Sequence, residues 1–213
     1  MARRTLRRID PELDLATHLL TLEELSPPLD AAAVFGRVAP LEVEIGSGKG
    51  LFVSAAASED PAADYLGIEV VAKYARFAAS RLAKRALPNA RMIHGDALRL
   101  FREFLTGNSL RAVHVYFPDP WWKARHRKRR VMNGPLLKDV ERTLVSGGTL
   151  HFWTDVEEYY QTSLEVIAAE TTLSGPLAVA EKPADHDLDY RTHFERRMRL
   201  HNEPIYRAEF RKP

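Results

Sequence analysis

The sequence predicts an α/β fold: a doubly wound, mostly parallel Rossmann-like sheet with an antiparallel strand at its C-terminal end. From residue 41 onward, apolar runs of strand length alternate with stretches of helical periodicity. A glycine-rich turn follows the first run, and successive runs end in an acidic residue. Ligands bind at the carboxyl ends of the strands in such sheets, so these acids mark the expected site.

Each element has its own signal in the sequence. The stretch 72–86 gathers small and apolar residues on one helical face, as a covering amphipathic helix requires: Ala75, Ala78, Ala79 and Leu82. Gly147 and Gly148 make a turn into the fifth strand, and the segment 205–210 alternates as an edge or added strand would. The expected strands are 41–45, 65–68, 91–94, 112–117, 149–154 and 205–210, and the expected helices are 51–57, 72–86, 98–105, 136–144 and 156–170.

The length of 213 residues suits one domain with a substantial core. We expect that domain to cover residues 41–213, preceded by an N-terminal extension, residues 1–40, which is basic at its start and whose order the sequence leaves open. No apolar run approaches the ~20 residues needed to span a bilayer, which predicts a soluble protein. Acidic residues follow the first arginines, so we expect no secretion signal and a cytoplasmic location: Asp10, Glu12 and Asp14.

The composition excludes several kinds of chemical site. The chain has no cysteine, which excludes disulfides, thiolate zinc sites and cysteine nucleophiles. The net charge is only +2, so attraction for a polyanion must come from local clusters. One cluster is Arg3, Arg4, Arg7 and Arg8, and the other is the run 123–130, in which six of eight residues are Lys or Arg. We expect no metal, no membrane and no obligate protein partner.

The first strand runs into a Gly-x-Gly-x-Gly turn that begins at Gly46, and its glycines let a ligand approach the backbone closely. The spacing fits neither a dinucleotide fingerprint nor a P-loop, so the turn alone leaves a plain strand-to-helix connection open. Glu69 ends the second strand 23 positions after Gly46, where an acid takes the hydroxyls of a ribose. Asp96 follows the third strand and is placed to accept from an adenine amine.

Strand-end acids without a fixed cation make a poor pyrophosphate site but suit a cationic nucleoside without phosphates. S-adenosylmethionine, a sulfonium, is that nucleoside. Any one of the acids alone is more simply a solvated strand-end carboxylate, and Glu44 in particular alternates as an outward-facing residue would. The expected cofactor-binding residues are Glu44, Gly46, Gly48, Glu69 and Asp96.

Asp119 follows the fourth strand between Pro118 and Pro120. Each proline fixes its own φ and biases the preceding residue away from helix, so a stiff turn presents the carboxylate; a turn or N-cap aspartate is the alternative. Trp121 and Trp122 come next, either as core or as a stacking surface for a base. The basic run then predicts phosphate contacts, against a plain solvated loop: Lys123, Arg125, Arg127, Lys128, Arg129 and Arg130.

Six motifs together resemble the bacterial-type tRNA (guanine-N7-)-methyltransferase family, from about residue 41 to residue 197. They are Glu-Ile-Gly-Ser-Gly-Lys-Gly (44–50), Gly-Ile-Glu (67–69), His-Gly-Asp-Ala (94–97), Phe-Pro-Asp-Pro-Trp with its basic continuation (117–130), Trp-Thr-Asp (153–155) and Thr-His-Phe-Glu (192–195). The resemblance implies a class I methyltransferase that transfers a methyl group from S-adenosylmethionine to N7 of the variable-loop guanosine, position 46, of tRNA. It implies that Asp119 binds the cofactor together with Glu44, Glu69 and Asp96 and also holds the catalytic position. It assigns to the tRNA Lys123, Asp155, Thr192, His193, Phe194 and Glu195.

Guanine N7 carries a lone pair and no proton, so its methylation needs positioning rather than a general base. We assign Asp119 to stabilise the positive charge that develops on the purine. An amino-methylating enzyme is the nearest rival, but its motif usually reads Asp/Asn-Pro-Pro-aromatic. The retained acids disfavour a non-catalytic RNA-binding protein, and the glycine spacing disfavours a nicotinamide oxidoreductase.

Overall fold

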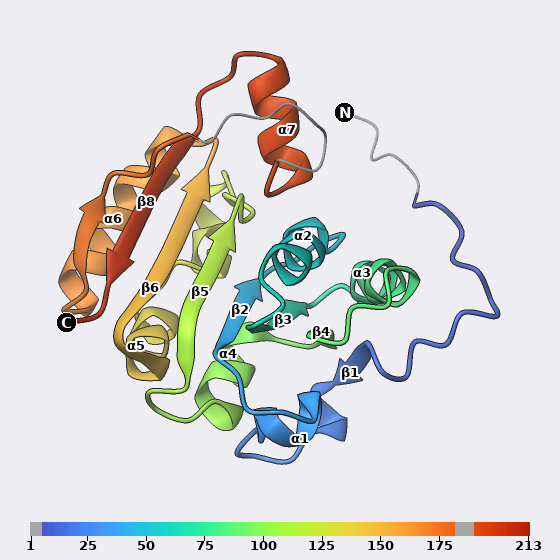
Figure 1. The fold of residues 1–213 in the computed structure, drawn as a ribbon. Coiled ribbons are helices and arrows are strands. Elements are labelled where there is room, and N and C mark those ends of the chain that lie inside the picture. The colour runs from blue at the N-terminus through green and yellow to red at the C-terminus, as the bar shows by residue number, and fades with distance from the viewer. Residues whose placement is uncertain (1–5, 182–189) are drawn as a thin grey trace.

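The computed structural model describes residues 6–181 and 190–213. Its centre is an eight-stranded sheet with the order β1-β4-β3-β2-β5-β6-β8-β7, in which β8 runs antiparallel to both its neighbours (Figure 1). The strands are β1 Leu19–Thr21, β2 Leu41–Ile45, β3 Asp64–Glu69, β4 Ala90–His94, β5 Leu110–Tyr116, β6 Leu144–Thr154, β7 Ser174–Leu177 and β8 Tyr206–Arg211.

Helices connect these strands and cover both faces of the sheet. They are α1 Ala31–Phe35, α2 Leu51–Glu59, α3 Ala72–Lys84, α4 Ala97–Arg99, α5 Gly134–Thr143, α6 Glu157–Glu170 and α7 His193–Leu200. A π-helical turn, Leu100–Phe104, continues α4, and single 3₁₀ segments span Leu22–Glu24 and Ala124–Arg129. The predicted fold class is therefore confirmed, including the antiparallel strand at the C-terminal end.

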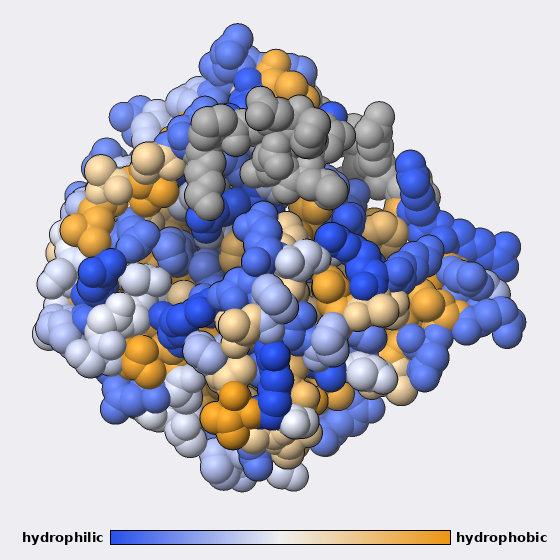
Figure 2. Space-filling view, viewed as in Figure 1, coloured by the Kyte–Doolittle hydropathy of each residue, from blue (hydrophilic) through white to orange (hydrophobic). Residues whose placement is uncertain are grey.

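The hydrophobic core forms two clusters on the two faces of the sheet. One packs α5 and α6 against residues such as Val43 and Val113, and the other packs α2 and α3 against residues such as Tyr65 and Met92. The side chains of β3 and β4 divide between these clusters, with Tyr65 and Met92 in one and Leu66 and Ile93 in the other, as a sheet covered on both faces requires. The face seen in Figure 2 is mainly hydrophilic, with apolar residues scattered across it.

Sequence patterns did not predict β1, β7, α7 or the 3₁₀ segment Ala124–Arg129. The strand β1 has three half-buried residues, and it is a strand because it pairs in parallel with β4. Leu22, directly after β1, is buried in the core, so part of the extension 1–40 packs on the domain. Arg3 and Arg4 of the N-terminal basic cluster lie outside the described residues. Within the described ranges, no helix is long and apolar enough to cross a membrane.

Strand register brings the predicted acids to one edge. Ile45 of β2 lies beside Ile68 of β3 and Val115 of β5, so these strands end at nearly the same level. The functional candidates lie at or directly after these strand ends: Gly46 follows β2, Glu69 is the last residue of β3, and the loop that carries Asp119 follows β5. Parallel strands share this carboxyl edge, which is where such folds bind ligands.

Candidate active site

The glycine turn between β2 and α2 is held by the neighbouring strand. The backbone amide of Gly46 donates to the carbonyl of Ile68 at 2.9 Å, and Gly46 and Gly48 have φ values of +75° and +52°. Such left-handed backbone favours glycine. Among residues 6–181 and 190–213, a Cβ atom on Gly46 would meet no atom within 4 Å, so the described part of the chain leaves this side of the turn open to a ligand. The turn therefore leaves room for the cofactor that the sequence predicts.

Glu69 at the end of β3 is buried and fixes two backbone segments. One carboxylate oxygen accepts from the amide of Gly48 at 2.9 Å, and the other accepts from the amide of Val71 at 2.8 Å. This carboxylate thus joins the glycine turn to the start of α3. The two residues after it, Val70 and Val71, expose apolar side chains, Val70 to 67%. Sequence reasoning missed this apolar pair, although its position after a strand-end acid was visible.

Glu44 is the most unusual acid of the site. The residue is only 4% exposed, and its Oε2 atom has no hydrogen-bond partner within the described part of the chain. Burial raises the pKa of Glu44 to about 8; Ser47 partly offsets this, and the charge of Glu69 adds to it. The outward-facing, solvated alternative for Glu44 therefore does not hold. A buried, unpartnered carboxyl oxygen is costly unless a ligand completes it, and a cation suits it.

Asp96 and Asp119 stand at the same edge but are exposed. Asp96 is the N-cap of α4, and its carboxylate accepts from the amide of Leu98 at 2.8 Å. Asp119 lies in the loop after β5, whose backbone has positive φ at Phe117 and Trp121. Positive φ is uncommon for such bulky residues, which identifies this loop as conformationally constrained. Asp155 follows β6, the strand that pairs with β5.

The basic run forms a compact segment beside Asp119. Five of its six cations are exposed: Lys123, Arg125, Arg127, Lys128 and Arg129. The indole of Trp121 lies 5.1 Å from the guanidinium of Arg129, while Trp122 is 67% exposed. The loop thus offers both charge and aromatic surface to solvent.

Arg130 differs from the other cations of the run because its side chain is buried. Its Nε donates to the carbonyl of Pro120 at 2.8 Å, and its Nη2 lies 2.6 Å from the carboxylate of Glu158. The guanidinium also packs on the ring of Tyr159. Arg130 therefore anchors the loop to α6, and we leave it out of the proposed phosphate contacts.

The segment Thr192–Glu195 forms the start of α7. Two of its side chains, those of Thr192 and Glu195, cap this helix. Thr192 Oγ1 accepts from the amide of Glu195 at 3.0 Å, and the buried carboxylate of Glu195 accepts from the amide of Arg191 at 2.7 Å. A Thr-x-x-Glu spacing is a signature of helix starts, which could have predicted this role. Phe194 is 47% exposed and stacks on Phe117 at 5.8 Å, which brings α7 to the end of β5. The outer surface of this segment is formed by His193 and Phe194.

Comparison with known proteins agrees with this geometry. A model of the family described as "Putative methyltransferase" matches residues 38–208. The tRNA (guanine-N(7)-)-methyltransferase of Rhodopirellula baltica is 47% identical over 218 residues, which cover 100% of this chain and 80% of that protein. The protein of the same name from Dechloromonas aromatica is 40% identical over 190 residues, 88% of this chain and 75% of that protein.

Solved structures with little sequence similarity share the fold. The 30S ribosomal A1408 methyltransferase from an uncultured bacterium superposes with a TM-score of 0.54 at 16% identity, over 85% of this chain and 92% of that one. The aminoglycoside resistance methyltransferase NpmB1 gives 0.51 at 16% identity, over 82% and 87%. The fold, the strand-end acids and the sequence relatives agree: the chain belongs to the tRNA (guanine-N7-)-methyltransferase family.

Proposed function

We propose that this chain methylates N7 of the variable-loop guanosine, position 46, of tRNA, with S-adenosylmethionine as the methyl donor. The observation that carries the proposal is the buried carboxyl group of Glu44 behind an open glycine turn, because its Oε2 atom has no partner among the described residues and this pairing suits a cationic nucleoside. Glu69, Asp96 and Asp119 end or follow parallel strands that share this carboxyl edge, which supports the proposal. The relatives named for this activity at 40–47% identity support it further.

Different residues of the site bind different parts of the cofactor. Glu44 faces the cationic part, Gly46 and Gly48 provide the backbone surface, and Glu69 has lone pairs left for the ribose hydroxyls. Asp96 stands where an exocyclic amine would donate to it, and the exposed Val70 offers an apolar face to the purine. When bound, the sulfonium would supply a methyl group that a nucleophile takes at carbon, with the thioether as the leaving group.

Asp119 acts on the acceptor guanine. The N7 lone pair forms the new bond to the methyl carbon while the carbon–sulfur bond breaks, and its electron pair stays on sulfur. The base thereby becomes positive, and a fixed carboxylate favours this developing charge. No proton leaves N7, so Asp119 need not be a base. Its exposure on a constrained loop fits a group that meets a substrate entering from solvent.

The tRNA is held by the surface around Asp119. Lys123 and the exposed part of the basic run contact phosphates, while Asp155 and the Thr192–Glu195 segment contact the nucleotide that reacts. The domain that performs this chemistry covers residues 41–213, and the basic start of the extension 1–40 serves as an additional RNA contact. The reaction takes place in the cytoplasm. The target guanosine must leave its tertiary pairing to reach the site, as enzymes that modify bases require.

Tritiated methyl transfer to bulk tRNA tests the proposal. Borohydride and aniline treatment of the product cleaves RNA at N7-methylguanosine, so a single cut at position 46 is the expected result. A transcript with adenosine at that position is the matched control and should stay uncut. Incorporation without any cleavage would contradict the N7 assignment.

Asp119→Asn separates the two roles of that residue. We expect turnover to fall by roughly 10²-fold or more, the size seen when one preorganised electrostatic group is removed. The measurement is single-turnover methylation at saturating cofactor and tRNA. Unchanged turnover with weaker cofactor binding would leave Asp119 as a binding residue only.

A further inference from the structure

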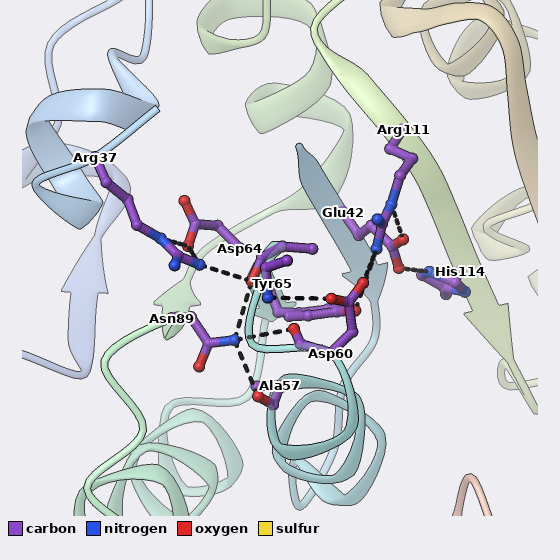
Figure 3. Close-up of polar contacts among 11 residues, drawn as sticks. Arg37, Glu42, Ala57, Asp60, Asp64, Tyr65, Asn89, Arg111 and His114 are labelled. Atoms are coloured by element: carbon purple, nitrogen blue, oxygen red, sulfur yellow. Dashed lines mark hydrogen bonds and ion pairs between the residues drawn. The ribbon is translucent and has the colours of Figure 1, made fainter. Parts of the chain in front are cut away.

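A chain of polar side chains, buried at its centre, links the residue Arg191, just before α7, to the interior of the sheet. The Nη1 atom of Arg191 donates to the hydroxyl of Tyr116 at 2.8 Å, and this hydroxyl lies 2.9 Å from Nδ1 of His114. The other ring nitrogen of His114 lies 2.8 Å from the carboxylate of Glu42, which also accepts from Nε of Arg111 at 2.6 Å. Figure 3 shows Arg111 and His114 of β5 converging on Glu42 of β2. We refer to these five residues as the Arg191 network.

The hydrogen bonds of the Arg191 network have one consistent direction. A guanidinium can only donate, so Tyr116 accepts from Arg191 and its single proton is free to bond Nδ1 of His114. His114 then carries its proton on the other nitrogen and donates it to Glu42. Burial lowers the pKa of His114, and the hydrogen bond from His114 helps to hold the pKa of Glu42 below its ordinary value although burial opposes this. His114 is thus neutral in a fully satisfied chain.

Arg191 sits at the junction of three parts of the site. Its guanidinium lies 5.2 Å from the ring of Trp153, a residue of β6 just before Asp155. Its partner Tyr116 is the last residue of β5, directly before the loop of Asp119. Its own backbone amide donates to Glu195, and Thr192 is its neighbour in the chain. One side chain therefore ties the start of α7 to the ends of the two strands that carry Asp119 and Asp155.

We propose that Arg191 is a positioning residue, which holds the segment Thr192–Glu195 at the reaction centre through Tyr116 and Trp153 without contacting the tRNA. The inference rests on the proposed function of this site. A guanidinium is required, because a planar group with several donors can bond Tyr116 while it stacks on the indole of Trp153. An ammonium keeps the charge but loses the stacked, forked geometry.

Arg191→Met should lower kcat/KM for tRNA roughly tenfold, the value of one hydrogen bond to a charged group, with the loss carried by KM for tRNA. Affinity for S-adenosylmethionine, measured by calorimetry, should stay unchanged, because the network does not touch the glycine turn. Arg191→Lys should behave like Arg191→Met. Rescue by lysine would instead identify Arg191 as a plain electrostatic contact and overturn the proposal.

Salt dependence separates positioning from phosphate binding. A residue that neutralises one phosphate contributes roughly 0.7–0.9 to the slope of log K against log salt. Tyr116→Phe and Arg191→Met should leave this slope as in the wild type, while Lys123→Met serves as the control that reduces it. A reduced slope for Arg191→Met would overturn the proposal.

A double-mutant cycle between Tyr116→Phe and Arg191→Met tests the link itself. We expect kcat/KM for tRNA of the double variant to be no lower than that of Arg191→Met alone, because both changes break the same contact. Additive losses would show that the two residues act separately. Urea unfolding of each variant checks that the fold is retained, and Tyr116→Phe, which removes one hydroxyl, keeps the test valid if Arg191→Met unfolds. If the wild type methylates no tRNA, the proposed function fails rather than this inference.

Discussion

Glu44→Gln isolates the cost of burying a carboxyl group that has an unpartnered oxygen. Burial raises the pKa of Glu44 from 4.5 to about 8; the hydrogen bond from Ser47 lowers it by a smaller amount, and the charge of Glu69 raises it further. The folded protein therefore binds this proton more tightly than the unfolded chain does. The stabilisation is fully present below the unfolded pKa and is lost as pH rises toward the folded pKa.

The size of the effect follows from the two pKa values. They differ by 8 − 4.5 = 3.5 units, which corresponds to about 4.8 kcal/mol once the folded carboxyl group is ionised. Between about pH 5 and about pH 8 this linkage lowers the unfolding free energy of the wild type by about 3.5 kcal/mol. Glutamine has a similar shape and does not titrate, so the variant should gain this much unfolding free energy relative to the wild type over that interval.

Urea unfolding of the cofactor-free proteins at the two pH values measures this gain. A constant offset from altered hydrogen bonding cancels, because only the change with pH is compared. Glu165→Gln on α6 is the control, since that exposed side chain stays in contact with water in both states. A stability difference between Glu44→Gln and the wild type that does not vary with pH would refute the buried, neutral carboxyl group.

Two pairs of variants test other parts of the structure. Arg129→Met should reduce the salt dependence of tRNA binding and leave unfolding unchanged, whereas Arg130→Met should destabilise the fold by roughly 1–3 kcal/mol through loss of its buried hydrogen bonds; the reverse pattern would contradict the separation of exposed and anchoring cations. Gly50→Ala should destabilise more than Gly147→Ala, as thermal unfolding would show. Both glycines have left-handed φ, of +65° and +75°, but only at Gly50 would the new Cβ lie 2.6 Å from a Cβ atom, that of Ala78. Equal losses of stability in the two variants would mean that backbone strain alone, and not the contact with Ala78, determines the effect.

Much of the fold could be read from local patterns. The strands β2 to β6 are apolar runs flanked by glycine turns and amphipathic helices, and the parallel sheet follows from their alternation. The strands β1 and β7 lack such a pattern, because short edge strands depend on pairing with a neighbour rather than on their own residues. The start of α7 had a readable Thr-x-x-Glu signal, but its buried Glu195 also has a contact with Arg207 of β8 that no local pattern shows.

The sequence by itself determined the chemistry that this chain presents: acids at successive strand ends, a glycine turn and a basic run after Asp119. These features are local, because strand alternation and turn residues fix which side chains reach the carboxyl edge. Only the tertiary structure decided which groups are solvated. It buried Glu44 with one carboxyl oxygen unpartnered among the described residues, turned Arg130 inward onto Glu158, and joined Arg191 to Tyr116 across 75 positions of the chain. Burial and pairing between distant segments arise from packing, and packing sets both the pKa of a carboxyl group and the freedom of a cation to meet RNA.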